Sequence, residues 1–187
     1  VNLVPSPEFT AFVTGRGEMF INVGAIIQSE TPNELIGVLA HETGHMANDD
    51  ITLFKGEYHF LSNFFACDIV LDGKRYSSVE HAYQAAKTLD RGERSRIRHA
   101  KLAGNAKQLG RIVTRRPDWE SIKLEIMESF LRQKFAPQSK LAAMLLATGE
   151  RELVEGNRWG DVFWGVCNGQ GENHLGKILM RIRDDLR

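Results

Sequence analysis

Residues 78–87 read Ser-Val-Glu-His-Ala-Tyr-Gln-Ala-Ala-Lys, and this stretch decides how the larger part of the chain folds. A serine at position 77 or 78 can cap a helix, which we expect to run to about Leu89. Four polar residues then share one helix face at the spacing i, i+3, i+4 and i+7: Glu80, Tyr83, Gln84 and Lys87. Such a stripe can line a pocket or form a solvated face, and spacing alone favours neither.

The segments around this helix predict an α+β fold that is predominantly helical with a small sheet. Asp72-Gly73 separates two alternating stretches, 67–71 and 74–76, as in a β-hairpin. Prolines at 117 and 137 separate further helical segments. We expect helices at 91–102, 105–114, 118–134 and 138–147, short strands at 153–154 and 162–166, and a last helix from about residue 173.

Polar and aromatic residues gather again near the C-terminus, between residues 157 and 165. They are Asn157, Trp159, Asp161, Phe163 and Trp164. Indole and phenyl rings stack on flat bases, and a carboxylate can bond ribose hydroxyls or stabilise a cation. This combination suits a nucleotide or nucleobase pocket. The alternative is an aromatic core strand flanked by a turn.

Composition places few limits on function. The chain has 187 residues, of which 42% are hydrophobic and 26% charged, and its formal net charge is zero, so nothing global demands nucleic acid or an anionic membrane. No apolar run approaches the ~20 residues of a membrane span, and we see no signal peptide. Cys67 and Cys167 form no C-x-x-C pair and are expected to be reduced, which favours a cytoplasmic protein. The oligomeric state stays open.

Residues 51–187 resemble the NADAR (YbiA-like) family in blocks that follow one another without a visible gap. The blocks are 56–64, 78–87, 106–111, 118–119, 134–135, 145–149, 153–155, 161–165 and 173–180. The resemblance implies an N-glycosidase that cleaves the bond between ribose and a base-like nitrogen. The implied substrates are a small N-riboside, such as a phosphoribosyl intermediate of riboflavin synthesis, or nucleic acid with ADP-ribose on guanine. No cofactor is required.

The resemblance also carries site residues by motif. Glu80 matches the glutamate of the S-x-E-H segment, Trp119 the D/N-W-E segment, and Asp161 and Trp164 the D-x-x-W-G segment. Cleavage of an N-glycosidic bond develops positive charge at C1, which a carboxylate can stabilise. We expect Glu80 to do this and Asp161 to hold the ribose or assist the leaving nitrogen, although the order could be reversed.

The remaining pocket residues are expected to bind the substrate. Trp119 and Trp164 would stack on the base or close off the pocket. Asn63 and Lys87 could hold phosphate or ribose oxygens. Tyr83 and Gln84 share the helix face of Glu80 and complete the expected binding residues.

A different motif precedes this domain. Residues 38–45 read Val-Leu-Ala-His-Glu-Thr-Gly-His, which puts His41 and His45 on one side of a helix with Glu42 beside them as a would-be base. Residues 8–50 resemble zinc endopeptidases of the HtpX and BepA-like type, with a strand hairpin before the H-E-x-x-H helix. Those peptidases take a third, carboxylate ligand from a downstream helix, and here another pattern begins after Asp50.

The sequence therefore predicts two domains, an incomplete peptidase-like fragment at 1–50 and a NADAR-type domain at 51–187. Two rival functions belong to other classes. One is a zinc-dependent metallopeptidase using His41, Glu42 and His45, and the other is a non-catalytic module that binds a nucleotide or ADP-ribose.

The incomplete ligand set leads to a testable expectation about zinc. Two histidines and water bind zinc weakly compared with a three-ligand site. We expect protein purified without chelator to contain no stoichiometric zinc by elemental analysis and to lack peptidase activity. One zinc per chain that disappears in a His45→Ala variant would contradict this expectation.

Overall fold

A computed structural model of the chain describes residues 2–5, 11–13, 19–22 and 50–187. The chain divides into two compact units, 1–50 and 51–187. In the first unit, β1 (Asn2–Val4) pairs in parallel with β3 (Met19–Asn22), and β2 (Ala11–Val13) pairs with β3 antiparallel. The H-E-x-x-H segment predicted to form a zinc-peptidase helix lies outside the described residues.

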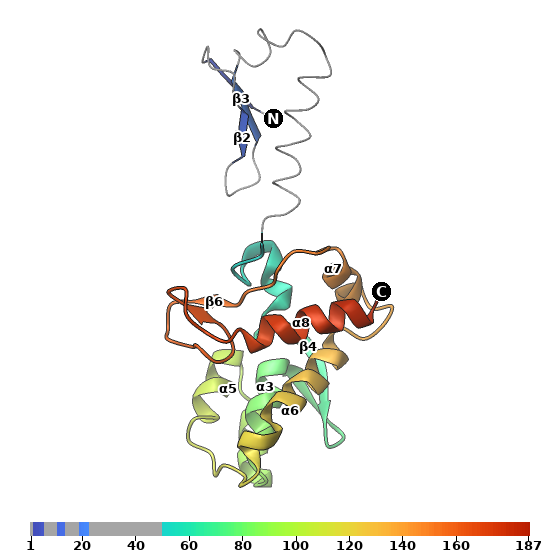
Figure 1. The fold of residues 1–187 in the computed structure, drawn as a ribbon. Coiled ribbons are helices and arrows are strands. Elements are labelled where there is room, and N and C mark those ends of the chain that lie inside the picture. The colour runs from blue at the N-terminus through green and yellow to red at the C-terminus, as the bar shows by residue number, and fades with distance from the viewer. Residues whose placement is uncertain (1, 6–10, 14–18, 23–49) are drawn as a thin grey trace. The chain divides into compact units, whose positions relative to one another are not determined.

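The second unit has an α+β fold in which helices predominate (Figure 1). The order of its elements is η1 (Gly56–Leu61), β4 (Ala66–Leu71), β5 (Lys74–Ser78), α3 (Val79–Ala86), α4 (Arg91–Arg98), α5 (Ala103–Leu109), α6 (Trp119–Lys134), α7 (Lys140–Leu146), β6 (Gly156–Asn157), β7 (Val166–Cys167) and α8 (His174–Asp185). This agrees with the helical fold and small sheet expected from the sequence.

The hairpin of β4 and β5 confirms the expected turn. Asp72 and Gly73 both have positive φ, 48° and 71°, as the two central residues of a tight hairpin turn require. The pairing runs from Leu71 opposite Lys74 to Ala66 opposite Ser78, with an irregularity between Ala66 and Ile69. The second strand of the hairpin ends at Ser78, and α3 begins at the next residue.

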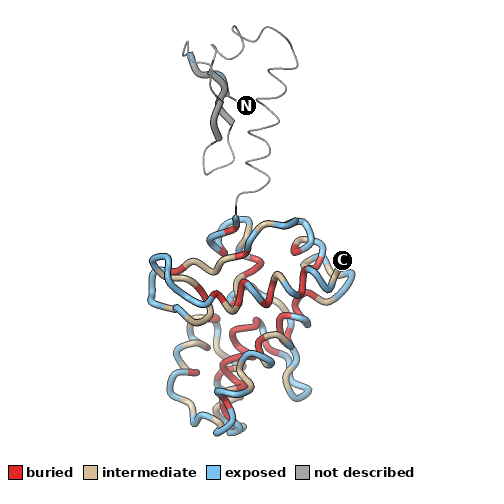
Figure 2. Tube along the Cα trace, in the orientation of Figure 1, coloured by how far each residue is buried: buried red, intermediate tan, exposed pale blue. Residues whose placement is uncertain are grey.

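The centre of the second unit is α3, every residue of which is buried (Figure 2). Its N-cap is Ser78, whose hydroxyl accepts from the backbone N–H of His81 at 3.3 Å. The His81 ring lies between that hydroxyl (Nδ1, 2.8 Å) and the carbonyl of Ala100 (Nε2, 3.1 Å). Since the Ala100 carbonyl can only accept, Nε2 carries the proton, and the histidine ties α3 to the chain after α4.

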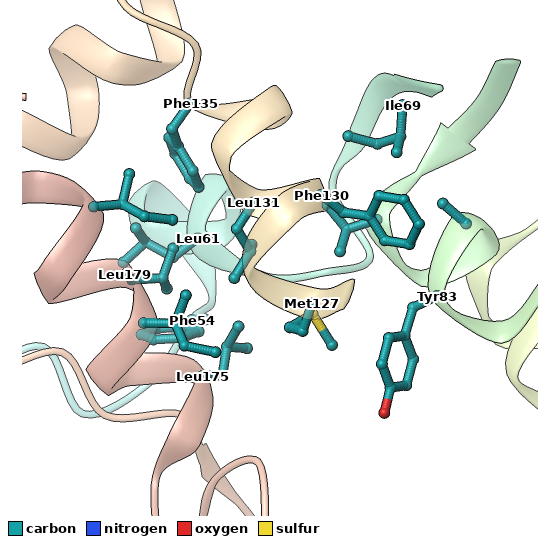
Figure 3. Packing of buried hydrophobic residues seen from close by; sticks show 14 of the residues in the cluster. Phe54, Leu61, Ile69, Tyr83, Met127, Phe130, Leu131, Phe135, Leu175 and Leu179 are labelled. Carbon is teal, nitrogen blue, oxygen red and sulfur yellow. The ribbon is translucent and has the colours of Figure 1, made fainter. Parts of the chain in front are cut away.

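The hydrophobic core lies on both sides of α6 (Figure 3). Leu131 and Met127 of α6 are buried against Leu61, Phe54, Leu175 and Leu179 on the side of η1 and α8, while Phe130 faces Ile69 of β4. Leu61, Leu131 and Leu179 have no exposed surface. Burial of side chains of this size stabilises the fold by roughly 1.5–3 kcal/mol each.

The segment from residue 158 to 165 differs from the strand expected at 162–166. It is a loop, and only β6 and β7 at its ends pair, in parallel. Asn157 accepts from the backbone of Asp161 and Trp159, and its amide donates to the carbonyls of Asp161 and Val166. Side chains thus satisfy backbone groups that a strand partner would otherwise satisfy. The strand expected at 153–154 is a single bridge between Leu153 and Ile51.

The first turn of α8 packs closely against the strand-like segment before β6. Asn173 donates from Nδ2 to the carbonyl of Leu153 at 2.9 Å and accepts from the N–H of Glu155 at 3.1 Å. A Cβ added to Gly176 would lie only 1.9 Å from the same Leu153 carbonyl oxygen. This contact leaves no space for a side chain at position 176.

We therefore expect Gly176→Ala to destabilise the protein by about 2 kcal/mol, because backbone on two elements must separate. Gly104→Ala is the matched control, since a Cβ at this helical position of α5 meets nothing within 4 Å. It should raise stability by roughly 0.5 kcal/mol through helix propensity. Urea unfolding of both variants measures the difference, and equal midpoints would contradict the packing argument.

A buried lysine, Lys134, ends α6. Lys134 is only 3% exposed. Its Nζ donates a hydrogen bond of 2.7 Å to the carbonyl of Ser62 and lies near the rings of Phe65 and Phe135. Burial lowers the pKa of Lys134 to about 7 from an ordinary value of 10.5, and the nearby Cys67 thiol opposes this shift. The folded protein therefore holds the proton of this amine less tightly than the unfolded chain does.

Stability should consequently depend on pH through Lys134. Between about pH 7 and 10 the unfolded chain binds a proton that the folded protein does not, so the free energy of unfolding should rise with pH in this window. Lys134→Met should lose that rise, whereas Lys140→Met, at an exposed position, should keep it. Denaturant unfolding at several pH values tests this, and parallel curves for wild type and Lys134→Met would contradict it.

Candidate active site

A cavity of about 590 Å³ opens in the second unit. It is bounded by the chain around η1, by α3 and α6, by Lys107 of α5, and by the segment 155–164. All eight site residues predicted within 51–187 line it: Asn63, Glu80, Tyr83, Gln84, Lys87, Trp119, Asp161 and Trp164. The polar stripe of the 78–87 helix is thus the wall of a pocket and not a solvated face.

Glu80 lies in the first turn of α3 and is 5% exposed. Its Oε1 accepts a hydrogen bond of 2.8 Å from Nε2 of Gln84, one helical turn along. Burial raises the pKa of Glu80, and the Gln84 bond together with the charges of Lys107 and Lys87 opposes the rise. The carboxyl group is therefore weakly solvated and held by an amide, so its charge acts strongly on anything bound beside it.

The position of Gln84 depends on a glycine at the end of α5. A Cβ added to Gly110 would lie 1.9 Å from Oε1 of Gln84 and 2.8 Å from its Cβ. The absence of a side chain at position 110 lets α5 approach α3 and fixes the amide that bonds Glu80. Gly110 lies in the family-like block 106–111, but the sequence analysis gave it no role in the site.

Aromatic rings form a continuous part of the pocket wall. The ring of Tyr83 lies 5.0 Å from that of Trp119 and 5.4 Å from that of Trp164, centroid to centroid, and Phe163 continues the row 5.1 Å beyond Trp164. Burial and the nearby Glu80 raise the pKa of the Tyr83 hydroxyl, which stays neutral. Such a wall offers flat apolar surface to a base or sugar.

Lysines supply positive charge to the same cavity. Lys87 follows α3, with Nζ 5.6 Å from the ring centroid of Tyr83, and burial lowers its pKa. Lys107 lies 5.6 Å from the ring centroid of Trp159, and Lys123 lies 3.9 Å from that of Phe163 while it bonds Glu120. Lys55 also lines the cavity, and of these four lysines only Lys87 was predicted as a site residue, although Lys107 lies in the family-like block 106–111.

Asn63 joins the pocket wall to the core. Its backbone carbonyl accepts from the N–H of Glu80 at 3.0 Å, and its Nδ2 lies 3.5 Å from the sulfur of Met127. Its Oδ1 is buried and has no hydrogen-bond partner among the described residues. A buried acceptor without a donor favours a bound ligand that carries hydroxyl or N–H groups.

Four carboxyl groups line the cavity, those of Glu80, Glu120, Glu155 and Asp161, and the sequence analysis assigned only Glu80 and Asp161. Asp161 accepts through Oδ1 from the backbone N–H groups of Phe163 and Trp164, at 3.2 and 2.9 Å. Glu120 is exposed and pairs with Lys123, whereas burial followed by the charge of Asp161 raises the pKa of Glu155 to about 7. Residues 153–155 belong to one of the family-like blocks, which was the available signal for Glu155.

The predicted zinc ligands lie outside the part of the chain that the structure describes. This holds for His41 and His45 as well as for Glu42. Among the described residues, no group of three or more His, Cys, Asp or Glu side chains could hold a metal ion. No helix among those residues is long and apolar enough to cross a membrane.

Comparison with known proteins gives two family matches. The NADAR domain family matches residues 53–187, and Peptidase family M48 matches residues 1–92. The N-glycosidase YbiA of Shigella boydii serotype 4 is 39% identical over 155 residues, which cover 80% of this chain and 96% of that protein. A riboflavin biosynthesis protein of Vibrio vulnificus is 40% identical over 131 residues, 68% of this chain and 35% of that protein.

The fold agrees with these matches. The NMR structure of the E. coli protein YbiA superimposes with a TM-score of 0.65 at 39% sequence identity, covering 74% of this chain and 86% of that one. The NADAR match takes in every element from η1 to α8 and all the residues around the cavity. On the strength of that match and of these relatives, the chain belongs to the NADAR domain family.

Proposed function

We propose that residues 51–187 form an N-glycosidase that hydrolyses the bond between a ribose and a base-like nitrogen. N-glycosidase activity is that of the chain's relatives, and it makes this protein a hydrolase of N-glycosyl compounds. The observation that carries the proposal is Glu80, a buried carboxyl group in a cavity walled by tryptophans and supplied with lysines. These are the groups that a cationic sugar and its flat leaving group require.

Glu80 acts on the sugar carbon in this mechanism. As the bond from C1 to nitrogen breaks, positive charge develops at C1 and the ring oxygen. The ionised Glu80 stabilises that charge and then accepts a proton from the water that attacks C1. Gln84 keeps the carboxylate oriented through its 2.8 Å hydrogen bond.

Asp161 and the aromatic residues position the substrate. The bonds to Phe163 and Trp164 use Oδ1 of Asp161, and we assign its carboxylate to ribose hydroxyls or to the leaving nitrogen. Trp119 and Trp164 stack on the base or exclude water, and Tyr83 supports both rings. Asn63 and Lys87 hold ribose or phosphate oxygens.

The substrates that we propose carry both a flat base and phosphate. A phosphoribosyl-amino-pyrimidine fits the name of the Vibrio relative, which refers to riboflavin biosynthesis. ADP-ribose linked to guanine in nucleic acid offers the same groups. The charges of Lys87, Lys107 and Lys123 around the cavity favour an anionic substrate of either kind.

The first unit receives a separate proposal. Its match to Peptidase family M48 supports an H-E-x-x-H segment of zinc-peptidase origin. We assign it no proteolytic role, because the sequence shows two ligands and no third.

The free thiols of Cys67 and Cys167 support a reducing compartment such as the cytoplasm.

Replacing Glu80 with Gln tests the mechanism, since it keeps the shape and removes the charge. We expect the turnover rate to fall by at least about 100-fold, with little change in KM, because the charge acts mainly in the transition state. The assay measures free-base release from a phosphoribosyl-amino-pyrimidine and from an oligonucleotide with ADP-ribose on guanine. Asp161→Asn should also be slow and, if Asp161 holds ribose hydroxyls, should raise KM.

Two matched controls accompany this experiment. Glu125→Gln changes an exposed glutamate of α6, and Glu42→Gln changes the peptidase-like motif, and both should keep the wild-type rate. Turnover by Glu80→Gln close to that of wild type on either substrate would remove Glu80 from the mechanism. Binding of ADP-ribose without any base release by wild type would support the non-catalytic module.

A further inference from the structure

The backbone of Glu155 is fixed on both sides, although its side chain has no role in the mechanism above. Its N–H donates to Oδ1 of Asn173 at 3.1 Å, and its carbonyl accepts from the N–H of Val166 at 2.9 Å. A Cβ on Gly165 would come within 2.1 Å of that carbonyl oxygen, so the glycine permits this close approach. Glu155 therefore stands at a rigid point of the cavity wall.

The side chain of Glu155 is placed so that it keeps a proton. Its Oε2 is covered and has no hydrogen-bond partner among the described residues, a situation that penalises the ionised form. Asp161 from the same loop and Glu80 from α3 face it with like charge, and Lys107 of α5 opposes them. Burial is the largest effect, and the pKa of Glu155 rises to about 7.

Cleavage of an N-riboside creates a need for such a group. A nitrogen that leaves as an anion is a poor leaving group, so it must gain a proton as the bond breaks. The hydrogen bonds to Glu80 and Asp161 come from N–H donors, which suit groups that accept. Among the four carboxyl groups that line the cavity, Glu155 alone has a covered oxygen without such a donor.

We propose that Glu155 is the general acid of the reaction and protonates the leaving nitrogen, an inference that rests on the N-glycosidase function proposed above. The bond between C1 and nitrogen breaks with its electron pair going to nitrogen, which takes the Glu155 proton. Water adds to C1 and gives its proton to Glu80. The products are the free base and ribose with a hydroxyl at C1, and proton exchange with solvent restores both carboxyl groups.

A pair of phosphoribosides that differ in the leaving group tests the assignment. A phosphoribosyl-amino-pyrimidine needs a proton on its amine, whereas nicotinamide mononucleotide releases a neutral pyridine without one. Glu155→Gln should slow release of the amino-pyrimidine by at least about 100-fold and release of nicotinamide by less than about tenfold. Glu80→Gln should slow both, because its charge serves the sugar in either case. Rates without enzyme are subtracted, since ribosylamines hydrolyse spontaneously.

The pH profile is a second readout that a purely structural role would not change. An acid acts while protonated, so kcat/KM of wild type should fall above the pKa of Glu155, about 7, and a separate decline at low pH should accompany protonation of Glu80. This fall of kcat/KM above pH 7 should be absent in Glu155→Gln. It should be retained in Glu155→Asp, because aspartate keeps a carboxyl group on a shorter side chain. Glu125→Gln serves again as the control, and thermal melts confirm that each full-length variant is folded.

The outcomes separate this inference from the proposed function. Wild type that releases base from neither riboside nor from the ADP-ribosylated oligonucleotide would overturn the N-glycosidase proposal itself. Active wild type, together with a Glu155→Gln variant that keeps its rate and its decline above pH 7, would overturn the role of Glu155 alone. Equal slowing of both phosphoribosides by Glu155→Gln would likewise show that it does not act on the leaving group.

Discussion

The site depends on one hydrogen bond, from Nε2 of Gln84 to Oε1 of Glu80, inside a helix that is buried along its whole length. A carboxyl group so far from water is unfavourable unless its surroundings bind it. Here the binding comes from the amide at 2.8 Å, while Lys87 and Lys107 act at longer range. Gly110 holds the amide in place through a contact that permits no Cβ. The packing of α5 on α3 thus determines how the Glu80 charge is presented.

Lys123 and Glu120 pair at 2.7 Å at the cavity, whereas the charges of Glu80, Lys87 and Lys107 there act on one another at longer range. Glu80, Glu155 and Asp161 face the same space as Lys87 and Lys107. Burial, followed by the like charge of Asp161, raises the pKa of Glu155 to about 7, and burial lowers the pKa of Lys87. The cavity therefore brings together a protonated acid, a carboxylate and ammonium groups. In the proposed reaction the acid serves the leaving nitrogen, the carboxylate the positive charge at C1, and the ammonium groups the phosphate.

The sequence predicted correctly those elements that depend on residues close together in the chain. The Asp72-Gly73 turn, the Ser78 cap and the stripe from Glu80 to Lys87 depend on neighbours within a few residues. The resemblance added Asn63, Trp119, Asp161 and Trp164, and all of them line the cavity. Glu155, Lys107 and Gly110 lie in the family-like blocks 153–155 and 106–111 but were given no role in the site, because their roles arise from contacts between segments far apart in the chain. Of the strand expected at 162–166, only Val166 is in a strand, since a run of apolar residues does not reveal the hydrogen bonds that Asn157 and Asp161 make.

The loop that replaces this strand joins the aromatic wall to the acid groups. Asp161 holds the N–H groups of Phe163 and Trp164 through one oxygen, so the same side chain contributes charge to the cavity and fixes the ring that packs on Tyr83. Gly165 then allows the chain to pass against the Glu155 carbonyl. A strand at this position would alternate its side chains between two faces. A loop held by its own side chains can instead direct Asp161, Phe163 and Trp164 to one cavity, all from the five residues of the D-x-x-W-G segment at 161–165.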